Sequence, residues 1–213
     1  MKPTKEYNGR SRIRMYLGDC MDLMKTGKWD LAIVDPPYGN GTKADAGTGE
    51  YSRRWLNNKK GNWDKRPGQQ YWISLPIISK NQIVFGANFF NLPPSRGWVC
   101  WYKSDEVKGR DFSEFEIAYT SFDRPSRHFE YKPFIRNGKR INPCQKPVQL
   151  YKWLLTNYAK EGDTIFDSHG GSMSIAIACW DLGFDLDIIE LDPDYFNDAV
   201  KRFEQHISQT QLF

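Results

Sequence analysis

Cysteine and histidine are scarce in this 213-residue chain, which has four cysteines and three histidines. The cysteines are Cys20, Cys100, Cys144 and Cys179, and none forms a Cys-x-x-Cys pair. Structural zinc sites and redox-active dithiols use closely spaced ligands, and a chain of this length does not need disulfides to build a core. We therefore expect reduced thiols and no metal site.

Long apolar runs are also missing. No segment approaches the roughly 20 apolar residues of a membrane-spanning helix, and the first residues, MKPTKEYNGRSRIRMYL, lack the apolar core of a signal peptide. Hydrophobic residues make up 39% of the chain and charged residues 26%, as in folded globular proteins. We expect one folded domain over residues 1–206, located in the cytoplasm and not in a membrane.

The net charge of +4 is small but unevenly distributed. The segment Thr42–Arg66 carries a net charge of +4 and the segment Arg124–Arg140 carries +5, so the rest of the chain is acidic, at −5. Two basic segments on an acidic body are typical of a surface that binds a polyanion such as nucleic acid. Solvated loops would give the same counts, so charge alone leaves both interpretations open.

Hydrophobic periodicity indicates strands that alternate with helices, most regularly in the last third of the chain. We predict strands at 13–17, 31–34, 82–85, 98–102, 115–121, 164–166 and 186–189, and helices at 147–159, at 173–182 and from Pro193 onward, the last capped by Asp192. Long polar loops are expected at 39–70 and 123–142. This alternation predicts an α/β fold with a doubly wound, mostly parallel sheet.

A strand, a small-residue loop and a helix form the first candidate binding unit. Asp167 and Glu190 are 23 residues apart, and each follows a predicted strand. In dinucleotide-type folds the loop lets the backbone approach the ligand, and the second acid accepts hydrogen bonds from a ribose. The loop 168–172 has few glycines for a phosphate cradle and no flanking Lys or Arg, which favours a ligand without a pyrophosphate, such as S-adenosylmethionine. An ordinary tight turn remains the alternative.

The second candidate unit is Asp35-Pro36-Pro37-Tyr38, directly after the strand LAIV. Ligands of open α/β sheets lie at the carboxyl ends of strands, and two prolines fix the backbone and remove two N–H donors. A carboxylate and a carbonyl that accept both N–H bonds of an exocyclic base amine would strengthen this weak nucleophile, and Tyr38 would stack on the base. The alternative is a proline-rich turn with a solvent-facing aspartate.

With the catalytic unit placed before the cofactor unit, the sequence resembles the permuted class of DNA amino-methyltransferases, including many isolated phage and prophage adenine methylases. The resemblance covers nearly the whole chain, through LGDCMDLM at 17–24, DPPYG at 35–39, NWD at 62–64, QIVFGANFF at 82–90, WVCWYK at 98–103, FSEFEIAYTSF at 112–122, NPCQKPVQLYKWLL at 142–155, FDSHGGSMS at 166–174 and IIELDPDYF at 188–196. It implies methyl transfer from S-adenosylmethionine to the N6 amine of an adenine flipped out of double-stranded DNA, with cytosine N4 as the alternative target.

The resemblance also implies residue roles. The base amine would be bound and activated by Asp35, Pro36, Pro37 and Tyr38. The cofactor would be bound by Asp19, Cys20, Gln145, Lys146, Asp167, His169, Gly170, Gly171, Ser172 and Glu190, with Gln145 and Lys146 near its methionine carboxylate; a surface position at the start of a helix is the alternative for Lys146. The two basic loops would contact DNA through Arg53, Arg54, Lys59, Lys60, Arg124, Arg127, Arg136, Lys139 and Arg140.

One position departs from the pattern. The family usually has a second glycine after the loop serine, where this chain has Met173. Its side chain would either crowd the cofactor or simply begin the helix, and a catalytically silent DNA-binding relic is the alternative that depends on this residue. Methyltransferases that act on protein glutamine or RNA more often resemble an Asn-Pro-Pro-Tyr pattern after the cofactor motif, so the acid and the motif order disfavour them.

The last residues, 207–213, form a predicted tail that ends Gln-Thr-Gln-Leu-Phe. Gln209, Leu212 and Phe213 resemble the short peptide with which bacterial DNA-associated proteins bind the replication sliding clamp. A polar anchor and two apolar side chains suit a surface pocket. The alternative is a frayed helix end whose Leu212 and Phe213 fold back onto the core.

If the tail binds the clamp, deleting residues 209–213 will abolish retention of the protein on immobilised sliding clamp, because the anchors are lost together. A pull-down of intact and shortened protein measures this. Equal retention of both proteins, or retention of neither, would contradict the clamp hypothesis.

Overall fold

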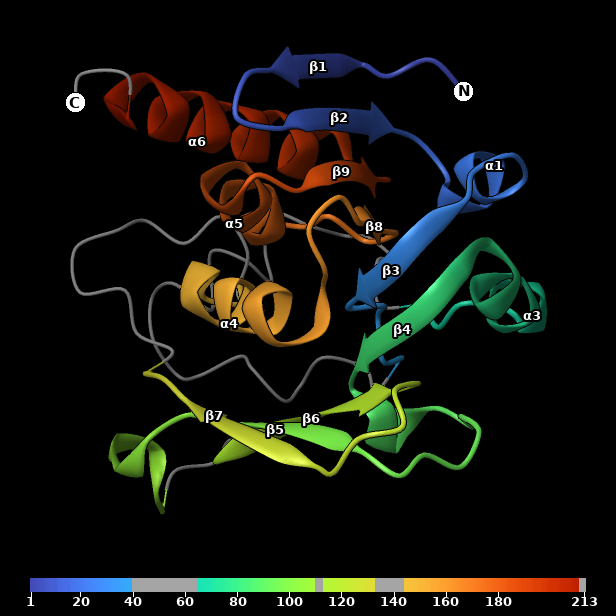
Figure 1. The fold of residues 1–213 in the computed structure, drawn as a ribbon, viewed down its shortest axis with the longest axis vertical. Coiled ribbons are helices and arrows are strands. Elements are labelled where there is room, and N and C mark those ends of the chain that lie inside the picture. The colour runs from blue at the N-terminus through green and yellow to red at the C-terminus, as the bar shows by residue number, and fades with distance from the viewer. Residues whose placement is uncertain (40–64, 110–112, 133–143, 211–213) are drawn as a thin grey trace.

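The computed structural model describes residues 1–39, 65–109, 113–132 and 144–210, which fold around one nine-stranded sheet (Figure 1). The strands are β1 (Lys5–Asn8), β2 (Arg12–Leu17), β3 (Trp29–Val34), β4 (Ser79–Phe85), β5 (Trp98–Tyr102), β6 (Phe115–Thr120), β7 (Arg127–Glu130), β8 (Thr164–Asp167) and β9 (Asp185–Glu190). The helices are α1 (Cys20–Met24), α3 (Gln69–Ile78), α4 (Val148–Tyr158), α5 (Ser174–Leu182) and α6 (Pro193–Thr210), with short 3₁₀ turns at Ala87–Phe89 and Asp105–Val107.

The sheet has the strand order β1-β2-β9-β8-β3-β4-β6-β5-β7. The five strands from β2 to β4 in this order are parallel, β6 runs antiparallel to β4 and β5, β7 is parallel to β5, and β1 is antiparallel to β2. This arrangement confirms the predicted α/β fold with a mostly parallel, doubly wound sheet.

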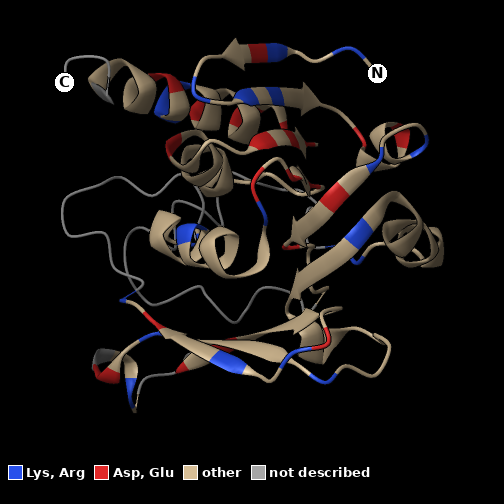
Figure 2. Ribbon diagram, viewed as in Figure 1, with Lys and Arg blue, Asp and Glu red and all other residues tan. Residues whose placement is uncertain are grey.

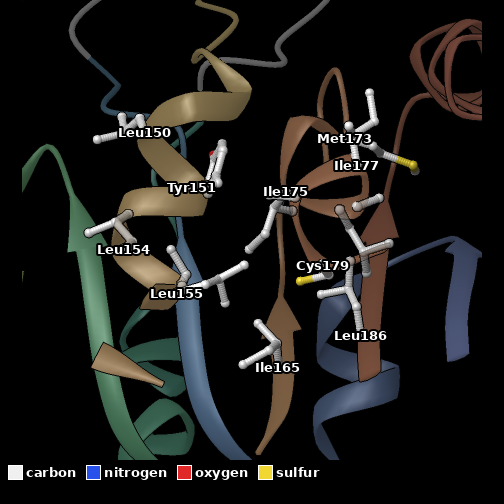
Figure 3. Packing of buried hydrophobic residues seen from close by; sticks show 14 of the residues in the cluster. Leu150, Tyr151, Leu154, Leu155, Ile165, Met173, Ile175, Ile177, Cys179 and Leu186 are labelled. Carbon is white, nitrogen blue, oxygen red and sulfur yellow. The ribbon is translucent and has the colours of Figure 1, made fainter. Parts of the chain in front are cut away.

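Helices cover both faces of the sheet, α4, α5 and α6 on one and α1 and α3 on the other (Figure 1). The sheet therefore has two cores: the first core lies under α4, α5 and α6, and the second lies under α1 and α3. Because successive strand residues point to opposite faces, Ile33 and Phe85 belong to the first core, whereas Val34 and Val84 belong to the second. Figure 3 shows α4, α5 and Ile165 of β8 meeting in the first core. Each fully buried aliphatic side chain contributes roughly 1.5–3 kcal/mol to folding.

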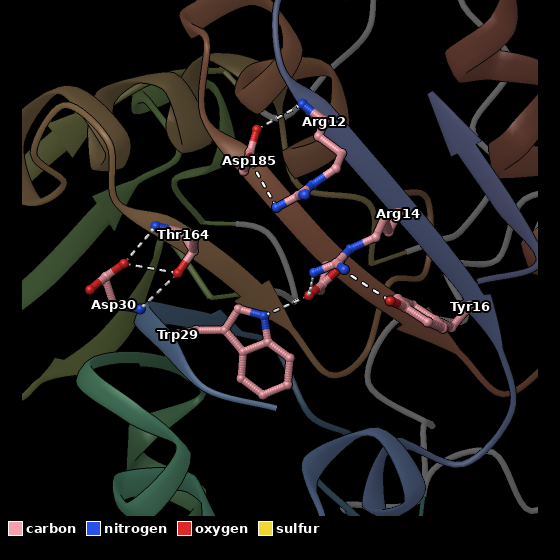
Figure 4. A network of polar contacts seen from close by, with 8 residues as sticks. Arg12, Arg14, Tyr16, Trp29, Asp30, Thr164 and Asp185 are labelled. Carbon is pink, nitrogen blue, oxygen red and sulfur yellow. Dashed lines mark hydrogen bonds and ion pairs between the residues drawn. The ribbon is translucent and has the colours of Figure 1, made fainter. Parts of the chain in front are cut away.

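Polar contacts tie β3 to β8 and β9 (Figure 4). At the start of the two strands, Asp30 of β3 accepts hydrogen bonds from the backbone N–H and the hydroxyl of Thr164, both at 2.8 Å. Trp29 stacks on Phe166 of β8, with ring centroids 4.2 Å apart, and its indole N–H donates across that strand to Asp187 of β9. These contacts fix β3 beside β8, although few residues pair directly between the two strands.

Local signals at helix ends agree with the sequence prediction. The side chain of Asp192 accepts the backbone N–H groups of Asp194 and Tyr195 at the start of α6. Gly183 ends α5 with a positive φ of 82°, the conformation that favours glycine after a helix.

Several predicted boundaries were wrong. The expected loop 39–70 gives way to α3 at Gln69, and the expected loop 123–142 contains β7, which adds an edge strand beside β5. The expected tail is helical as far as Thr210, so Gln209 lies on α6, while Leu212 and Phe213 lie outside the described residues. Neither β1 nor α1 was predicted. Among the described residues, no helix is long and apolar enough to span a membrane.

Met173 occupies a left-handed backbone conformation, with φ 51° and ψ 36°, immediately before α5. Its side chain is buried in the core with α4 and α5, as Figure 3 shows. The side chain therefore packs into the core at the residue that begins the helix, which favours the predicted helix start over the alternative in which Met173 crowds the cofactor. The left-handed conformation gives a physical reason for the family glycine at this position.

Replacing Met173 separates these two effects. Met173→Ala should lower the free energy of unfolding by about 2–5 kcal/mol, because it leaves a cavity in the core. Met173→Gly removes these buried atoms and the Cβ as well, but it relieves a left-handed strain of about 1 kcal/mol, so the glycine variant should be the more stable of the two. Denaturant titration measures both values, and a glycine variant less stable than the alanine variant would contradict this account.

Candidate active site

The direction in which the chain crosses the sheet reverses between β8 and β3. From β8 the chain continues through α5 to β9 on one side, whereas from β3 it continues to β4 on the other side. Such a reversal leaves space at the carboxyl ends of the two central strands, where open α/β sheets bind their ligands. Asp35 follows β3 and Asp167 ends β8, so the two predicted motifs lie at the same edge.

The segment after β3 presents a tyrosine ring and a carboxylate together. The Tyr38 hydroxyl donates to Asp35 Oδ1 at 2.8 Å, and the ring stacks on Phe89 with centroids 4.8 Å apart. Gly86 allows this close approach, because a Cβ there would lie 2.1 Å from the Tyr38 ring. Burial, followed by the negative charge of Asp35, raises the pKa of Tyr38 well above its usual value, so the hydroxyl stays protonated and donates.

Asp35 is also paired with a buried lysine. Lys146 Nζ donates to Asp35 Oδ2 and lies 3.3 Å from Glu116 Oε2, and Lys103 Nζ lies 2.8 Å from Glu116 Oε1. The side chain of Lys146 is only 4% exposed. The predicted alternative of a surface lysine is therefore wrong.

Asp167 is fully enclosed, with 1% of its surface exposed. Burial raises its pKa to about 8, and the negative charges of Asp35 and Glu190 add to this shift, while the hydrogen bond from the His169 N–H opposes it. A carboxyl group in this environment favours a positively charged ligand, because such a ligand would offset the cost of its ionised form.

The loop after β8 is fixed by contacts to β9. The Gly171 N–H donates to Glu190 Oε2 at 2.6 Å, and the Gly170 N–H donates to the Ile189 carbonyl at 2.9 Å. A Cβ on Gly170 would lie 3.1 Å from the side chain of Ile188, so a larger residue there would require that side chain to shift by a few tenths of an ångström. Ser172, which is also in this loop, is buried.

On another side, the loop after β8 is contacted by Tyr71 of α3. The hydroxyls of Tyr71 and Ser168 are 2.7 Å apart, and Ser168 also contacts His169 Nδ1 at 2.7 Å. Burial lowers the pKa of His169 to about 4, so this imidazole is neutral at physiological pH. Tyr71 was not predicted as a site residue.

Asp19 and Cys20 lie at the start of α1, near the same loop. Asp19 caps the helix by accepting the Met21 N–H at 2.8 Å, and its charge acts on His169. Burial, and then the charge of Asp19, raise the pKa of Cys20 to about 12, so its thiol stays protonated. Gln145 is buried next to Lys146. The predicted cofactor residues therefore converge on one edge of the sheet.

Two residues predicted to contact DNA, Arg124 and Arg127, lie away from the candidate active site. Arg124 donates to the Asn157 carbonyl and Arg127 to the Asn157 side chain, at the far end of α4 from Lys146. The 11 residues of α4 separate its ends by about 16 Å. Basic and acidic residues are mixed over β1, β2 and α6 (Figure 2). The remaining predicted contacts, Arg53, Arg54, Lys59, Lys60, Arg136, Lys139 and Arg140, lie outside the described residues.

Sequence reasoning missed Glu116 and Lys103, which complete the charged cluster around Lys146. A signal for Glu116 is present in β6, where it shares one strand face with the buried residues Ala118 and Thr120. A charged residue on the buried face of a strand requires a partner.

The raised pKa of Asp167 predicts a pH-dependent stability. Between its ordinary value of 3.8 and about 8, the folded protein retains a proton that the unfolded chain releases. The free energy of unfolding therefore falls as pH rises through this window, by at most about 1.4 kcal/mol per pH unit. Asp167→Asn should thus be more stable than the native protein without ligand, by a margin that grows from pH 5 to pH 8 in thermal unfolding. A margin that stays constant, or equals that of the exposed control Asp198→Asn, would contradict this.

Comparison with known proteins agrees with this geometry. Residues 69–201 match the model of a family described as DNA methylase, N6_N4_Mtase. The chain is 23% identical to the type II methyltransferase M1.MboII of Moraxella bovis over an alignment 246 positions long, which covers 85% of this chain and 91% of the relative.

Two solved structures share the fold. The complex of M1.HpyAVI with S-adenosylmethionine superposes with a TM-score of 0.57 at 20% identity, covering 89% of this chain and 99% of that one. The cytosine-N4-specific PvuII DNA methyltransferase gives 0.58 at 13% identity, covering 92% and 90%. The region matched by the family model, residues 69–201, includes β8, β9 and the loop between β8 and α5, and it exceeds half of the sequence. The chain therefore belongs to the N6_N4_Mtase family of DNA methylases.

Proposed function

We propose that this protein transfers a methyl group from S-adenosylmethionine to an exocyclic amine of a DNA base, with adenine N6 as the target. The observation that carries the proposal is the arrangement of Asp35 and Tyr38 at the end of β3, next to the buried carboxyl group of Asp167 at the end of β8. A proline-rich turn with a solvent-facing aspartate does not account for this enclosure, since Asp35 is 19% exposed.

The charges at the edge of the sheet fit this cofactor. S-adenosylmethionine carries a sulfonium and an ammonium group, and the negative charges of Asp35 and Glu190 both act on Asp167. An ammonium at Asp167 would offset the burial that raises its pKa. Glu190 is oriented by the N–H groups of Gly171 and Asp192, and each carboxylate oxygen retains a second lone pair for a ribose hydroxyl.

The residues around Asp35 have the properties that amine methylation needs. When bound, S-adenosylmethionine supplies an electrophilic methyl group, whose bond to sulfur breaks with its electron pair going to sulfur as the new nitrogen–carbon bond forms. Asp35 accepts an N–H of the base amine, which draws electron density onto the nitrogen and orients its lone pair. Asp35 can also receive the proton that the methylated nitrogen loses. Tyr38 offers a ring face for the base.

The enclosure of Asp35, whose side chain is 19% exposed, limits the form in which a DNA base can reach it. An amine in a stacked base pair would not reach this carboxylate, so the base must leave the duplex. This proposal keeps the DNA contacts predicted for Arg53, Arg54, Lys59, Lys60, Arg136, Lys139 and Arg140. Arg124 and Arg127, at the other end of α4, are less suited to bind DNA around the flipped base.

Cytosine N4 is the second candidate target, because the same amine chemistry serves both bases and a structural neighbour is cytosine-N4-specific. A silent relic is disfavoured, because Met173, the residue on which that alternative depended, is buried in the core.

Methyl transfer from labelled S-adenosylmethionine to unmethylated duplex DNA, followed by nucleoside analysis, tests the function. The native protein should produce N6-methyladenine. Asp35→Asn should lower kcat by about 10²–10³-fold, because the amide cannot accept and retain a proton in the same way. The exposed Asp123→Asn serves as the matched control and should keep full activity.

The products separate the alternatives. N4-methylcytosine would keep the mechanism and overturn the choice of base. An Asp35→Asn variant as active as the control would overturn the assigned catalytic residue. Cofactor binding without any methylated DNA would contradict DNA as the proposed substrate. If the protein bound no cofactor and formed no product, the proposed enzymatic activity itself would be overturned.

A further inference from the structure

Four charged side chains alternate in sign behind the candidate active site. Asp35 follows β3, Lys146 precedes α4, Glu116 lies in β6 and Lys103 follows β5. The contacts run from Asp35 to Lys146, from Lys146 to Glu116 at 3.3 Å, and from Glu116 to Lys103 at 2.8 Å. The two lysines balance the two acids, so the cluster is neutral as a whole.

The buried ammonium at the centre of this cluster depends on both acids. Burial lowers the pKa of Lys146, but Asp35 and Glu116 more than offset this effect, and the net pKa is raised. Burial likewise raises the pKa of Glu116, whereas Lys146 and Lys103 reverse the shift and lower it. An ammonium with one partner removed would be poorly compensated, which commonly costs several kcal/mol in a protein interior.

The donors of Lys146 are used within the protein. An ammonium has three N–H donors. One reaches Asp35, one faces Glu116, and Nζ also lies 4.6 Å from the centroid of the Phe85 ring. This geometry does not direct Lys146 toward a cofactor carboxylate, the role that the family resemblance implied.

We propose that Lys146 and Glu116 are positioning residues for Asp35. Lys146 holds Asp35 Oδ2 while Tyr38 holds Oδ1, which fixes the carboxylate in one orientation before the base arrives. When the base amine donates to Asp35, Glu116 keeps Lys146 paired, so the hydrogen bond to the amine forms without an unpaired buried ammonium. This inference rests on the proposed function and adds two residues to its machinery.

The charge of Asp35 is also influenced by groups from other elements. Besides Lys146 and Glu116, the titratable groups around it are Tyr38 of its own segment, Tyr71 of α3, Tyr151 of α4 and Asp167 of β8. Among these groups Lys146 is the cation. Removing it leaves Asp35 near the two acids Glu116 and Asp167 without a cation in contact with it among the described residues.

Three variants test the proposal: Lys146→Met, Glu116→Gln, and the double variant, which removes both charges together. Lys146→Met should lower kcat by about 100-fold and move the acid limb of the kcat–pH profile up by about one pH unit or more. The double variant should return the acid limb to near its native position, because no excess negative charge remains. Lys201→Met, at an exposed position of α6, is the control.

Cofactor affinity distinguishes positioning from cofactor binding. By calorimetry, the dissociation constant for S-adenosylmethionine should change less than about threefold in all variants, far below the tenfold that 1.4 kcal/mol of lost contact would produce. A tenfold weaker cofactor affinity with unchanged kcat in Lys146→Met would overturn the proposal, and so would an acid limb that does not move.

A stability measurement separates this inference from the proposed function. The midpoint of thermal unfolding should fall further in Lys146→Met than in the double variant, because the single change leaves two acids without their shared ammonium. Equal or reversed losses would overturn the shared-ammonium arrangement even if the native protein methylated nothing. Absence of methylation by native protein, with the expected order of midpoints, would instead contradict the proposed function alone.

Discussion

The pairing of β3 with β8 determines the rest of the site, because it brings Asp35 and Asp167 to one edge of the sheet. The hydrogen bonds between Asp30 and Thr164 secure the beginning of this pair, and Trp29 packs over Phe166. The two strands are more than 100 residues apart in the sequence, so closing this contact carries a considerable loss of chain entropy. The polar and aromatic contacts at the amino ends of the strands help to offset that loss at a distance from the chemistry.

The candidate site contains buried charged groups, whose burial does not favour folding by itself. Asp167 is buried with a raised pKa, and the ammonium of Lys146 is enclosed between two acids. Groups of this kind lower the stability of a fold unless they are paired, and strongly shifted pKa values are concentrated at functional sites. The remainder of the first core is apolar and closely packed against α4, α5 and α6, which allows the fold to tolerate these charges.

Most of the fold and both motifs could be predicted from the sequence, because strand alternation, helix caps and glycine turns are local signals. The two segments with the candidate site residues also lie at one edge of the sheet, since the carboxyl ends of the neighbouring parallel strands β3 and β8 meet there. The sequence did not predict β7, β1, α1 or α3: β7 and β1 are short edge strands with mostly exposed side chains, α1 has only five residues, and α3 contains Pro76. The buried pairing of Lys146 with Glu116 was missed for a different reason.

Lys146 and Glu116 come together only through tertiary structure. Lys146 stands before a helix, where a lysine is usually solvated, and Glu116 lies on a strand at the far side of β4. No local pattern indicates that these two residues share a buried contact, whereas the motif around Asp35 is contiguous. Sequence reasoning therefore found the residues that follow strands, assigned Lys146 a different role, and missed Glu116, which contacts Lys146 from another element.

A crystal structure of the protein with S-adenosylmethionine would test the central claim most directly. We predict that the methionine end of the cofactor lies between the 168–172 loop and Asp35, with its ribose at Glu190 and with Lys146 still paired to Asp35 and Glu116. Cofactor bound at another edge of the sheet, or a salt bridge from Lys146 to its carboxylate, would contradict the account.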